Sequence, residues 1–388
     1  MALKDYANII HRCFRCGWCK FPGDFYDFNC PAYIRYRLET YSTGGRLWLI
    51  RAWMNNEIEW TDRLAQIVYS CAACKNCTEQ CVMEFSDDIV NMIKAARNEM
   101  VERGTIPAIV KEFLENIQRQ GNPYGNARTK RGEWLEGTNI EHYNGQEFLY
   151  YVGCVGSYDT RAREIARALG KVLLKAGVSF GVLGNDEPCE GNEVNILGEE
   201  SLFEMLAEDN IKQFKDLGVK KIVTLDPHAY NAFKNDYPKL GAEFEVLHYT
   251  QLLRDLIKSK KLDVSHGFKA RVTYHDPCLL GRWNKEYDAP REILNAIPGI
   301  ELVEMVRSRE NALCCGGGGG NFYTDFLGGS DDSPARIRIR EAADTGASIV
   351  AVACPNCMSM LEDALKTEGL EEKLRVRDIS ELVSEAIK

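Results

Sequence analysis

The spacing of apolar and polar positions changes at about residue 146. Beyond that point, short runs rich in β-branched and aromatic residues alternate with longer segments whose apolar residues recur every three or four positions. The short runs are 147–154, 179–183 and 221–226, and the longer segments are 160–177, 198–218 and 229–237. This alternation predicts parallel strands with helices on both faces of a sheet, and it places a first α/β domain at residues 146–262.

The same pattern returns from about residue 271. Strand-like runs cover 271–278, 301–305 and 348–354, and amphipathic segments cover 289–297, 333–346 and 355–366. We therefore expect a second α/β domain, residues 263–388, that repeats the first. Segments 33–60 and 86–104 have helical spacing, which predicts a helical domain at residues 1–145. The expected class is α+β multi-domain: a helical domain followed by two pseudo-symmetric α/β domains with parallel sheets.

Composition narrows the possible partners. The chain has 388 residues, 45% of them hydrophobic, and a net charge of −9 without a basic stripe, which argues against nucleic acid as a partner. No apolar run approaches the roughly 18 residues of a membrane span, and the first residues lack the basic-then-apolar order of a signal peptide. We expect a cytoplasmic protein without a membrane span, associated with a membrane only through a partner.

Fifteen cysteines point to metal chemistry. Their odd number, the repeated Cys-x2-Cys spacing and the absence of a signal peptide favour metal binding over a disulfide framework. Two stretches stand out in the first 145 residues. One is CFRCGWC at 13–19, followed by Cys30-Pro31, and the other is CAACKNCTEQC at 71–81.

These stretches follow the logic of bacterial ferredoxins, in which three neighbouring thiolates and one remote cysteine hold each [4Fe–4S] cubane. Two cubanes are therefore predicted in a ferredoxin-like domain. The first ligand set is Cys13, Cys16, Cys19 and Cys81, and the second is Cys71, Cys74, Cys77 and Cys30. The sequence departs from the pattern by a ten-residue insertion before Cys30 and by Val82 in place of proline. Two zinc sites are the alternative, although zinc more often uses separated cysteine pairs.

The two α/β halves align through their cysteines. Cys154 and Cys189 correspond to Cys278 and Cys314, whereas Glu190, Asp226 and Ala229 stand where the second half has Cys315, Cys354 and Cys357. These positions follow predicted strands, and the carboxyl ends of parallel strands meet at one edge of a sheet. We expect five thiols to converge there in the second half: Cys278, Cys314, Cys315, Cys354 and Cys357.

Five glycines follow the adjacent pair Cys314-Cys315. Glycine allows close approach of the backbone, so we expect Gly316, Gly317 and Gly318 to bring N–H groups to metal-bound sulfur. A phosphate or dinucleotide site is the alternative. The run lacks the G-x-G-x-x-G turn between strand and helix that such a site requires.

At these residues the sequence resembles the cysteine-rich (CCG) domain family, notably in HDPCLLGR, APREIL, CCGGGGG and CPNC. Twin ferredoxin motifs followed by two CCG domains are similar to the D subunit of heterodisulfide reductase and to the iron–sulfur subunits of glycolate oxidase and anaerobic glycerol-3-phosphate dehydrogenase. The resemblance implies that the five cysteines of the second copy hold one noncubane [4Fe–4S] cluster, at which heterodisulfide reductases cleave a disulfide.

The first copy departs from that family pattern. Because three of its five thiols are replaced, we expect it to keep the fold without a cluster. A zinc site formed by Cys154, Cys189, Asp226 and His228 is the alternative. In the second copy His275, three residues before Cys278, is a catalytic candidate that donates to cluster sulfur or passes a proton to a product thiolate.

No flavin, nicotinamide or haem motif is present, so we expect a subunit of a larger oxidoreductase complex. The expected partners are other redox subunits, such as a flavoprotein dehydrogenase, a ferredoxin-type carrier or a membrane cytochrome. The first hypothesis is electron transfer through two cubanes to or from the noncubane cluster. The alternative makes that cluster catalytic, reducing a disulfide or heterodisulfide to thiols. A structural zinc scaffold is a third class, which requires zinc in every cysteine group.

Overall fold

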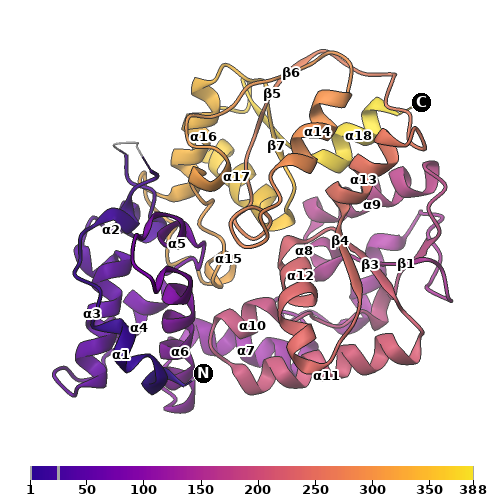
Figure 1. The fold of residues 1–388 in the computed structure, drawn as a ribbon. Coiled ribbons are helices and arrows are strands. Elements are labelled where there is room, and N and C mark those ends of the chain that lie inside the picture. The colour runs from indigo at the N-terminus through magenta and orange to yellow at the C-terminus, as the bar shows by residue number, and fades with distance from the viewer. Residues whose placement is uncertain (1, 24–26, 388) are drawn as a thin grey trace.

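A computed structural model describes residues 2–23 and 27–387 (Figure 1). Three parts follow one another: a helical part drawn in indigo and purple, an α/β part in magenta and salmon, and an α/β part in orange and yellow. This architecture confirms the expected fold class. The domain limits at residues 145/146 and 262/263 remain a prediction.

The N-terminal part consists of short helices around an apolar core. Two of them begin at side-chain caps, because the Ser42 and Thr61 hydroxyls accept hydrogen bonds from backbone N–H groups of the following turn. Val68 and Met92 are fully buried in this core. The elements are η1 (Leu3–Tyr6), α1 (Ala7–Ile10), η2 (Trp18–Lys20), α2 (Pro31–Tyr36), η3 (Glu39–Tyr41), α3 (Thr43–Met54), α4 (Asp62–Tyr69), α5 (Asn76–Gln80), η4 (Ser86–Asp88), α6 (Ile89–Glu102), α7 (Ala108–Gln120) and η5 (Arg128–Leu135).

The first α/β part contains a four-stranded parallel sheet in the order β2-β1-β3-β4. Its central strand β1 is buried along its whole length, as expected when helices cover both faces. The strands are β1 (Phe148–Tyr151), β2 (Phe180–Gly181), β3 (Lys221–Thr224) and β4 (Glu245–His248). The helices are α8 (Gly153–Tyr158), α9 (Thr160–Lys175), η6 (Gly184–Asp186), α10 (Asn192–Ile196), α11 (Glu200–Asp216), α12 (Pro227–Asn231), η7 (Ala232–Asp236), η8 (Tyr237–Leu240) and α13 (Tyr249–Lys258).

The second α/β part repeats this plan with the equivalent order β6-β5-β7-β8, again all parallel. The strands are β5 (Ala270–Tyr274), β6 (Ile300–Leu302), β7 (Ile349–Val352) and β8 (Arg375–Asp378). The helices are α14 (Asp288–Ala296), η9 (Arg309–Asn311), α15 (Asn321–Thr324), α16 (Pro334–Asp344), α17 (Pro355–Thr367) and α18 (Ile379–Ala386). The shared strand order confirms the internal repeat.

The two copies pack directly against each other. Helix α9 of the first copy contacts α18 and α17 of the second, and α13 contacts α14. A buried hydrogen bond from the Tyr249 hydroxyl to Asp378 Oδ1, 2.8 Å long, crosses this interface. The carboxyl ends of the outer strands β4 and β8 are thereby held close to one another. Among the described residues, no helix has the length and apolarity needed to cross a membrane.

Candidate metal centres

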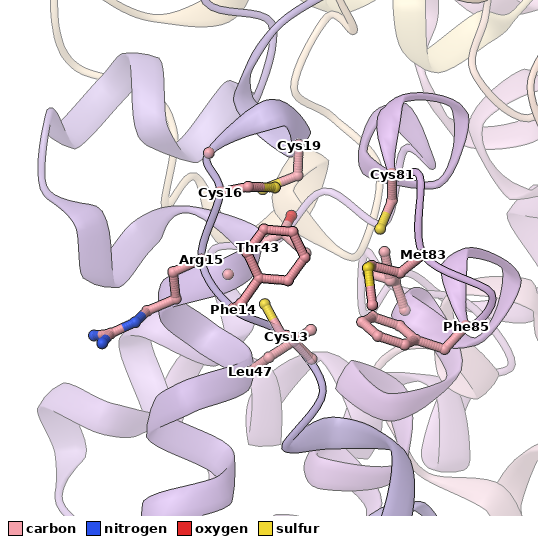
Figure 2. A pocket seen from close by; sticks show the side chains of 13 residues that line it. Cys13, Phe14, Arg15, Cys16, Cys19, Thr43, Leu47, Cys81, Met83 and Phe85 are labelled. Atoms are coloured by element: carbon pink, nitrogen blue, oxygen red, sulfur yellow. The ribbon is translucent and has the colours of Figure 1, made fainter.

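The first group of thiols lies in the N-terminal part (Figure 2). One pocket is lined by Cys13 and Cys16 on the loop after α1, by Cys19 in η2 and by Cys81 at the end of α5, together with apolar side chains of α3 and α6. Burial raises the pKa of Cys19 to about 12, since an ionised sulfur loses its hydration there. A bound cation is what stabilises thiolates in such surroundings. The structure brings together the four residues predicted for the first cubane.

The second group lies next to the first. Cys30, Cys71, Cys74 and Cys77 are buried around one pocket, which Cys19 of the first group also lines. The insertion before Cys30 does not carry this cysteine away, because the Lys20 carbonyl accepts hydrogen bonds from the N–H groups of both Asn29 and Cys30. The loop therefore closes on itself. The structure assembles the predicted second set despite the departure from ferredoxin spacing.

Three buried arginines surround the second group, and sequence reasoning missed all of them. Arg46 donates to Ile67 O and Ser70 Oγ, Arg97 to carbonyls that include Cys71 O, and Arg282 to Cys74 O and Ala312 O. Among residues 2–23 and 27–387, no carboxylate forms an ion pair with any of these guanidinium groups. A buried cation needs a compensating anion. The soft thiolate donors and these cations together fit an anionic iron–sulfur cluster.

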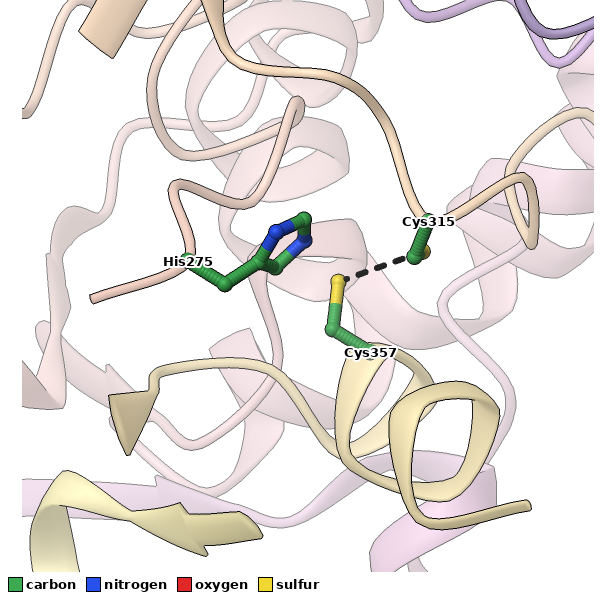
Figure 3. Close-up of side chains that lie close together, drawn as sticks. All are labelled: His275, Cys315 and Cys357. Atoms are coloured by element: carbon green, nitrogen blue, oxygen red, sulfur yellow. Dashed lines mark hydrogen bonds between the residues drawn. The ribbon is translucent and has the colours of Figure 1, made fainter. Parts of the chain in front are cut away.

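The third group is the five-cysteine set of the second copy. The sulfur atoms of Cys315 and Cys357 are 3.5 Å apart (Figure 3), and those of Cys278 and Cys314 are 3.8 Å apart. Cys354 is the N-cap of α17 and interacts with Cys357. Four of the five are buried, and Cys278 is partly exposed. The pKa of Cys315 lies well below its ordinary value, because its interactions with the Cys314 and Cys357 thiols, and more weakly with His275, favour the thiolate.

His275 is buried directly beside this group (Figure 3). Its ring lies within 4.8 Å of the Cys315 and Cys357 sulfurs. Arg338 Nε donates to Nδ1 over 3.1 Å, and this bond leaves the ring proton on Nε2, which has no nitrogen or oxygen partner among the described residues. Burial lowers the pKa of His275 and so favours the neutral ring. The predicted role as donor to sulfur agrees with this placement and remains a prediction.

The glycine run has two structural tasks, of which the sequence indicated one. Gly316 N–H donates to Cys314 Sγ over 3.4 Å, as expected for a backbone that approaches sulfur. Gly318 and Gly319 instead pack against the backbone of the second thiol group. A Cβ at Gly318 would lie 2.6 Å from Ala72 O, and one at Gly319 would lie even closer to Cys71 O. The run therefore also allows the N-terminal part to dock on the third group.

This docking brings the second and third thiol groups into contact. Cys74 and Cys314 interact through their sulfurs, and the Arg282 guanidinium lies close to both. Trp283 Nε1 donates to Ala73 O over 2.9 Å and fixes the same loop. The three groups thus form a row, with Cys19 between the first and second groups and the pair Cys74–Cys314 between the second and third.

The first copy has a different arrangement at the equivalent edge of its sheet. Cys154, Cys189 and Glu190 form one group, whereas Asp226 and His228 form another with Cys354 of the second copy. The four residues considered for zinc are therefore split between two groups. Arg131, which was not foreseen, donates to Cys154 Sγ over 3.4 Å and pairs with the buried Glu187 at 2.9 Å.

Glu190 and Tyr151 complete this first group. Tyr151 donates to Glu190 Oε2 over 3.1 Å, and burial raises the pKa of Glu190 to about 7. The group is thus held by a guanidinium, a hydroxyl and a carboxyl group that is partly protonated near neutral pH. Hydrogen bonds between protein side chains therefore stand in the first copy where the second copy has thiols.

Known proteins match this organisation. The family model described as "Cysteine-rich domain" matches residues 148–234 and 272–362, and that described as "4Fe-4S dicluster domain" matches 9–85. The D subunit of the dihydromethanophenazine:CoB–CoM heterodisulfide reductase of Methanosarcina barkeri is 33% identical over 82% of this chain and 78% of the relative. The chain belongs to the iron–sulfur oxidoreductase family that includes this heterodisulfide reductase component.

Other relatives are longer. The probable iron–sulfur-binding oxidoreductase FadF of Bacillus subtilis is 41% identical over 82% of this chain but only 46% of its own length. The EtfAB:quinone oxidoreductase of Syntrophomonas wolfei is 35% identical over 83% of this chain and 47% of its own. The chain therefore spans about half the length of these two curated relatives.

A solved structure shares the fold. The crystal structure of a hypothetical protein from Helicobacter pylori covers 89% of this chain and 67% of its own, with a TM-score of 0.54 and 10% identity. At this identity the likeness concerns the fold alone.

Proposed function

We propose that this chain is an electron-transfer subunit of an oxidoreductase complex, with two [4Fe–4S] cubanes and one noncubane [4Fe–4S] cluster. The single observation that carries the proposal is the row of three thiol groups, linked by Cys19 and by the pair Cys74–Cys314. Groups of iron–sulfur ligands in direct contact suit the passage of electrons from one group to the next. The proposed ligands are Cys13, Cys16, Cys19 and Cys81; Cys71, Cys74, Cys77 and Cys30; and Cys278, Cys314, Cys315, Cys354 and Cys357.

The clusters, when bound, would supply one-electron oxidation and reduction. The chain's own residues hold the thiolates and offset their charge. Arg46 and Arg97 border the second group, and Arg282 lies between the second and third. The Gly316 N–H donates to Cys314 sulfur, and hydrogen bonds of this kind set the reduction potential of iron–sulfur centres.

One end of the row reaches the surface, and we propose that electrons enter or leave there. Cys16 is exposed, and the neighbouring Phe14 and Trp18 are exposed by 61% and 53%. A flavoprotein dehydrogenase, a ferredoxin-type carrier or a membrane cytochrome would approach this end. We propose a cytoplasmic subunit that reaches the membrane through partners, and relatives named as an EtfAB:quinone oxidoreductase and as a probable membrane-anchored ferredoxin support an association with the membrane.

A catalytic role is the second candidate, and one observation favours it. Cys278, alone among the five thiols of the third group, is partly exposed, so this is the thiol that a small molecule would meet first. A disulfide bond opened there would take up two electrons and two protons and give two thiols. Relatives named as D subunits of heterodisulfide reductase support this alternative.

The test of the proposal is the metal content of anaerobically purified protein, combined with electron paramagnetic resonance. Three clusters require about twelve irons and as many sulfides per chain, with little zinc. About eight irons, with signals of reduced cubanes only, would contradict the third cluster, and stoichiometric zinc without iron would contradict the proposal as a whole. Oxidation of a reduced dye by an added disulfide, catalysed by this chain alone, would favour the catalytic alternative.

A further inference from the structure

The first copy, although it lacks three of five thiols, keeps a buried polar network at the same edge of its sheet. His228, Asp226 and Glu193 are each at most 8% exposed. His228 Nδ1 lies 2.7 Å from Asp226 Oδ1, and Nε2 lies 3.3 Å from Glu193 Oε1. Asp226 also caps α12 by accepting from the His228 backbone N–H. The imidazole is therefore held from two sides and cannot turn freely.

This network reaches into the second copy at two points. The His228 ring and the Asp226 carboxylate both lie within 4.8 Å of Cys354 Sγ, and the ring interacts with that thiol. Glu193 accepts a hydrogen bond from the backbone N–H of Gly320, at the end of the glycine run. The first copy thus contacts both the Cys354 thiol and the loop that follows Cys314 and Cys315.

The repeat shows that the fold does not require this histidine. Asp226 and Cys354 are the N-caps of the equivalent helices α12 and α17, and each is followed by proline. The residue after that proline is His228 in the first copy and Asn356 in the second. The turn therefore accepts asparagine. A buried imidazole between two carboxylates is costly to desolvate, so its presence calls for a task beyond capping.

Charge around the ring suits a donor. Asp226 faces Nδ1, Glu193 faces Nε2, and Cys354 Sγ lies within 4.8 Å of the ring. The groups facing the ring from both copies are thus acceptors: two carboxylates and a sulfur.

We propose that His228 is a positioning residue of the third site, supplied by the first copy, whose Nε2–H, next to Glu193, donates to Cys354 sulfur and so tunes the reduction potential of the cluster held there. This inference rests on the proposed function, because it requires a cluster on the five thiols. Hydrogen bonds to ligand sulfur stabilise the more negative, reduced state and raise the potential. The first copy has then exchanged cluster ligands for a residue that acts on its neighbour's cluster.

The test compares His228→Leu, which fills the space without a donor, with His228→Gln, which keeps an N–H. Each is purified anaerobically, and the midpoint potential of the third cluster is measured by redox titration with paramagnetic resonance. We expect His228→Leu to lower the midpoint potential of the third cluster by about 59 mV. For a one-electron couple this is about a tenfold change in the ratio of oxidised to reduced cluster at a fixed potential. His228→Gln should shift it by less than half as much. Iron content and cubane signals should stay as in the unsubstituted protein.

His248→Gln is the matched control, since His248 is buried in the same copy and interacts with Thr250 Oγ1 at 2.7 Å instead of sulfur. His248→Gln should leave the midpoint potential of the third cluster unchanged. Equal shifts for His228→Leu and His228→Gln, or no shift in either, would overturn the inference. Loss of about four irons from His228→Gln with the cubanes retained would also overturn it, because His228 would then be a ligand. Absence of a third cluster from the unsubstituted protein would instead refute the proposed function.

Discussion

The two cysteine-rich copies have the same strand order, yet they use the equivalent sheet edge differently. In the second copy, five thiols lie there beside His275. In the first, Glu190 and Asp226 replace two thiols, and the Arg131 guanidinium donates to Cys154. A fold that gathers strand ends at one edge offers a site there whatever residues occupy it. The residues at that edge then decide whether it carries thiol ligands for a metal or a network of hydrogen bonds between side chains.

The largest difference between the copies should appear in cluster content. We expect Cys315→Ser to remove the third cluster, about four of about twelve irons, because a hydroxyl is a poor replacement for a soft thiolate ligand. Cys189→Ser, in the first copy, should leave the iron content unchanged. Iron analysis and paramagnetic resonance check both variants. Loss of iron from Cys189→Ser would show that the first copy also holds a cluster.

Arg131 should be the residue whose loss most destabilises the first copy. Arg131→Met leaves Glu187 buried without its cation, which costs about 3–5 kcal/mol of unfolding free energy. The double variant Arg131→Met/Glu187→Gln should recover part of that loss. Anaerobic denaturant unfolding measures both. Equal stability of the single variant and the unsubstituted protein would mean that the first copy does not depend on this pair.

Glu190 should make the first copy sensitive to pH. Its folded pKa, about 7, lies above the ordinary value of 4.5, so the folded state binds the proton more tightly. The resulting stability is fully present below about pH 4.5 and is lost as pH rises through 7, roughly 3 kcal/mol in all. Glu190→Gln should remove this dependence. Thermal unfolding at pH 5 and pH 8 checks it, and an unchanged pH profile in the variant would contradict the assignment.

The smallest effect should come from a single methyl group in the glycine run. Gly319 and Gly329 have similar left-handed backbones, with φ of +64° and +67°, so alanine introduces the same strain at both, about 1–2 kcal/mol. Only at Gly319 would the new Cβ meet Cys71 O; at Gly329 it meets nothing within 4 Å. We expect Gly319→Ala to cost about 1–3 kcal/mol more than Gly329→Ala. Equal costs in denaturant unfolding would contradict the close docking at Gly319.

Several local features could be predicted from the sequence because their signals are local. The helical spacing of 86–104 and the strand-like runs at 221–226 and 348–354 correspond to α6, β3 and β7. The edge strands β4 and β8 were missed. Both are short and only partly buried, with exposed Glu245 and Arg375 at their starts, so the apolar run that identifies a buried strand is absent.

The candidate sites divide in the same way. Cysteine spacing was enough to group the thiols of each predicted cluster, since the remote partners Cys30 and Cys81 follow from ferredoxin logic. Arg46, Arg97 and Arg282 carry no such signal. In the sequence, an arginine that donates to buried carbonyls cannot be distinguished from an arginine on the surface. Only the packing of the folded chain shows which arginines are buried.

The sequence by itself determined the repeat, the parallel α/β plan and the three thiol groups, because periodicity and cysteine spacing can be read along a single domain. Tertiary structure alone decided that Gly318 and Gly319 dock on the Cys71 loop and that His228 of one copy meets Cys354 of the other. These contacts join segments more than a hundred residues apart in sequence. They depend on how whole domains pack. The hydrophobic pattern of the sequence indicates that a side chain is buried, but it does not indicate which residues that side chain contacts.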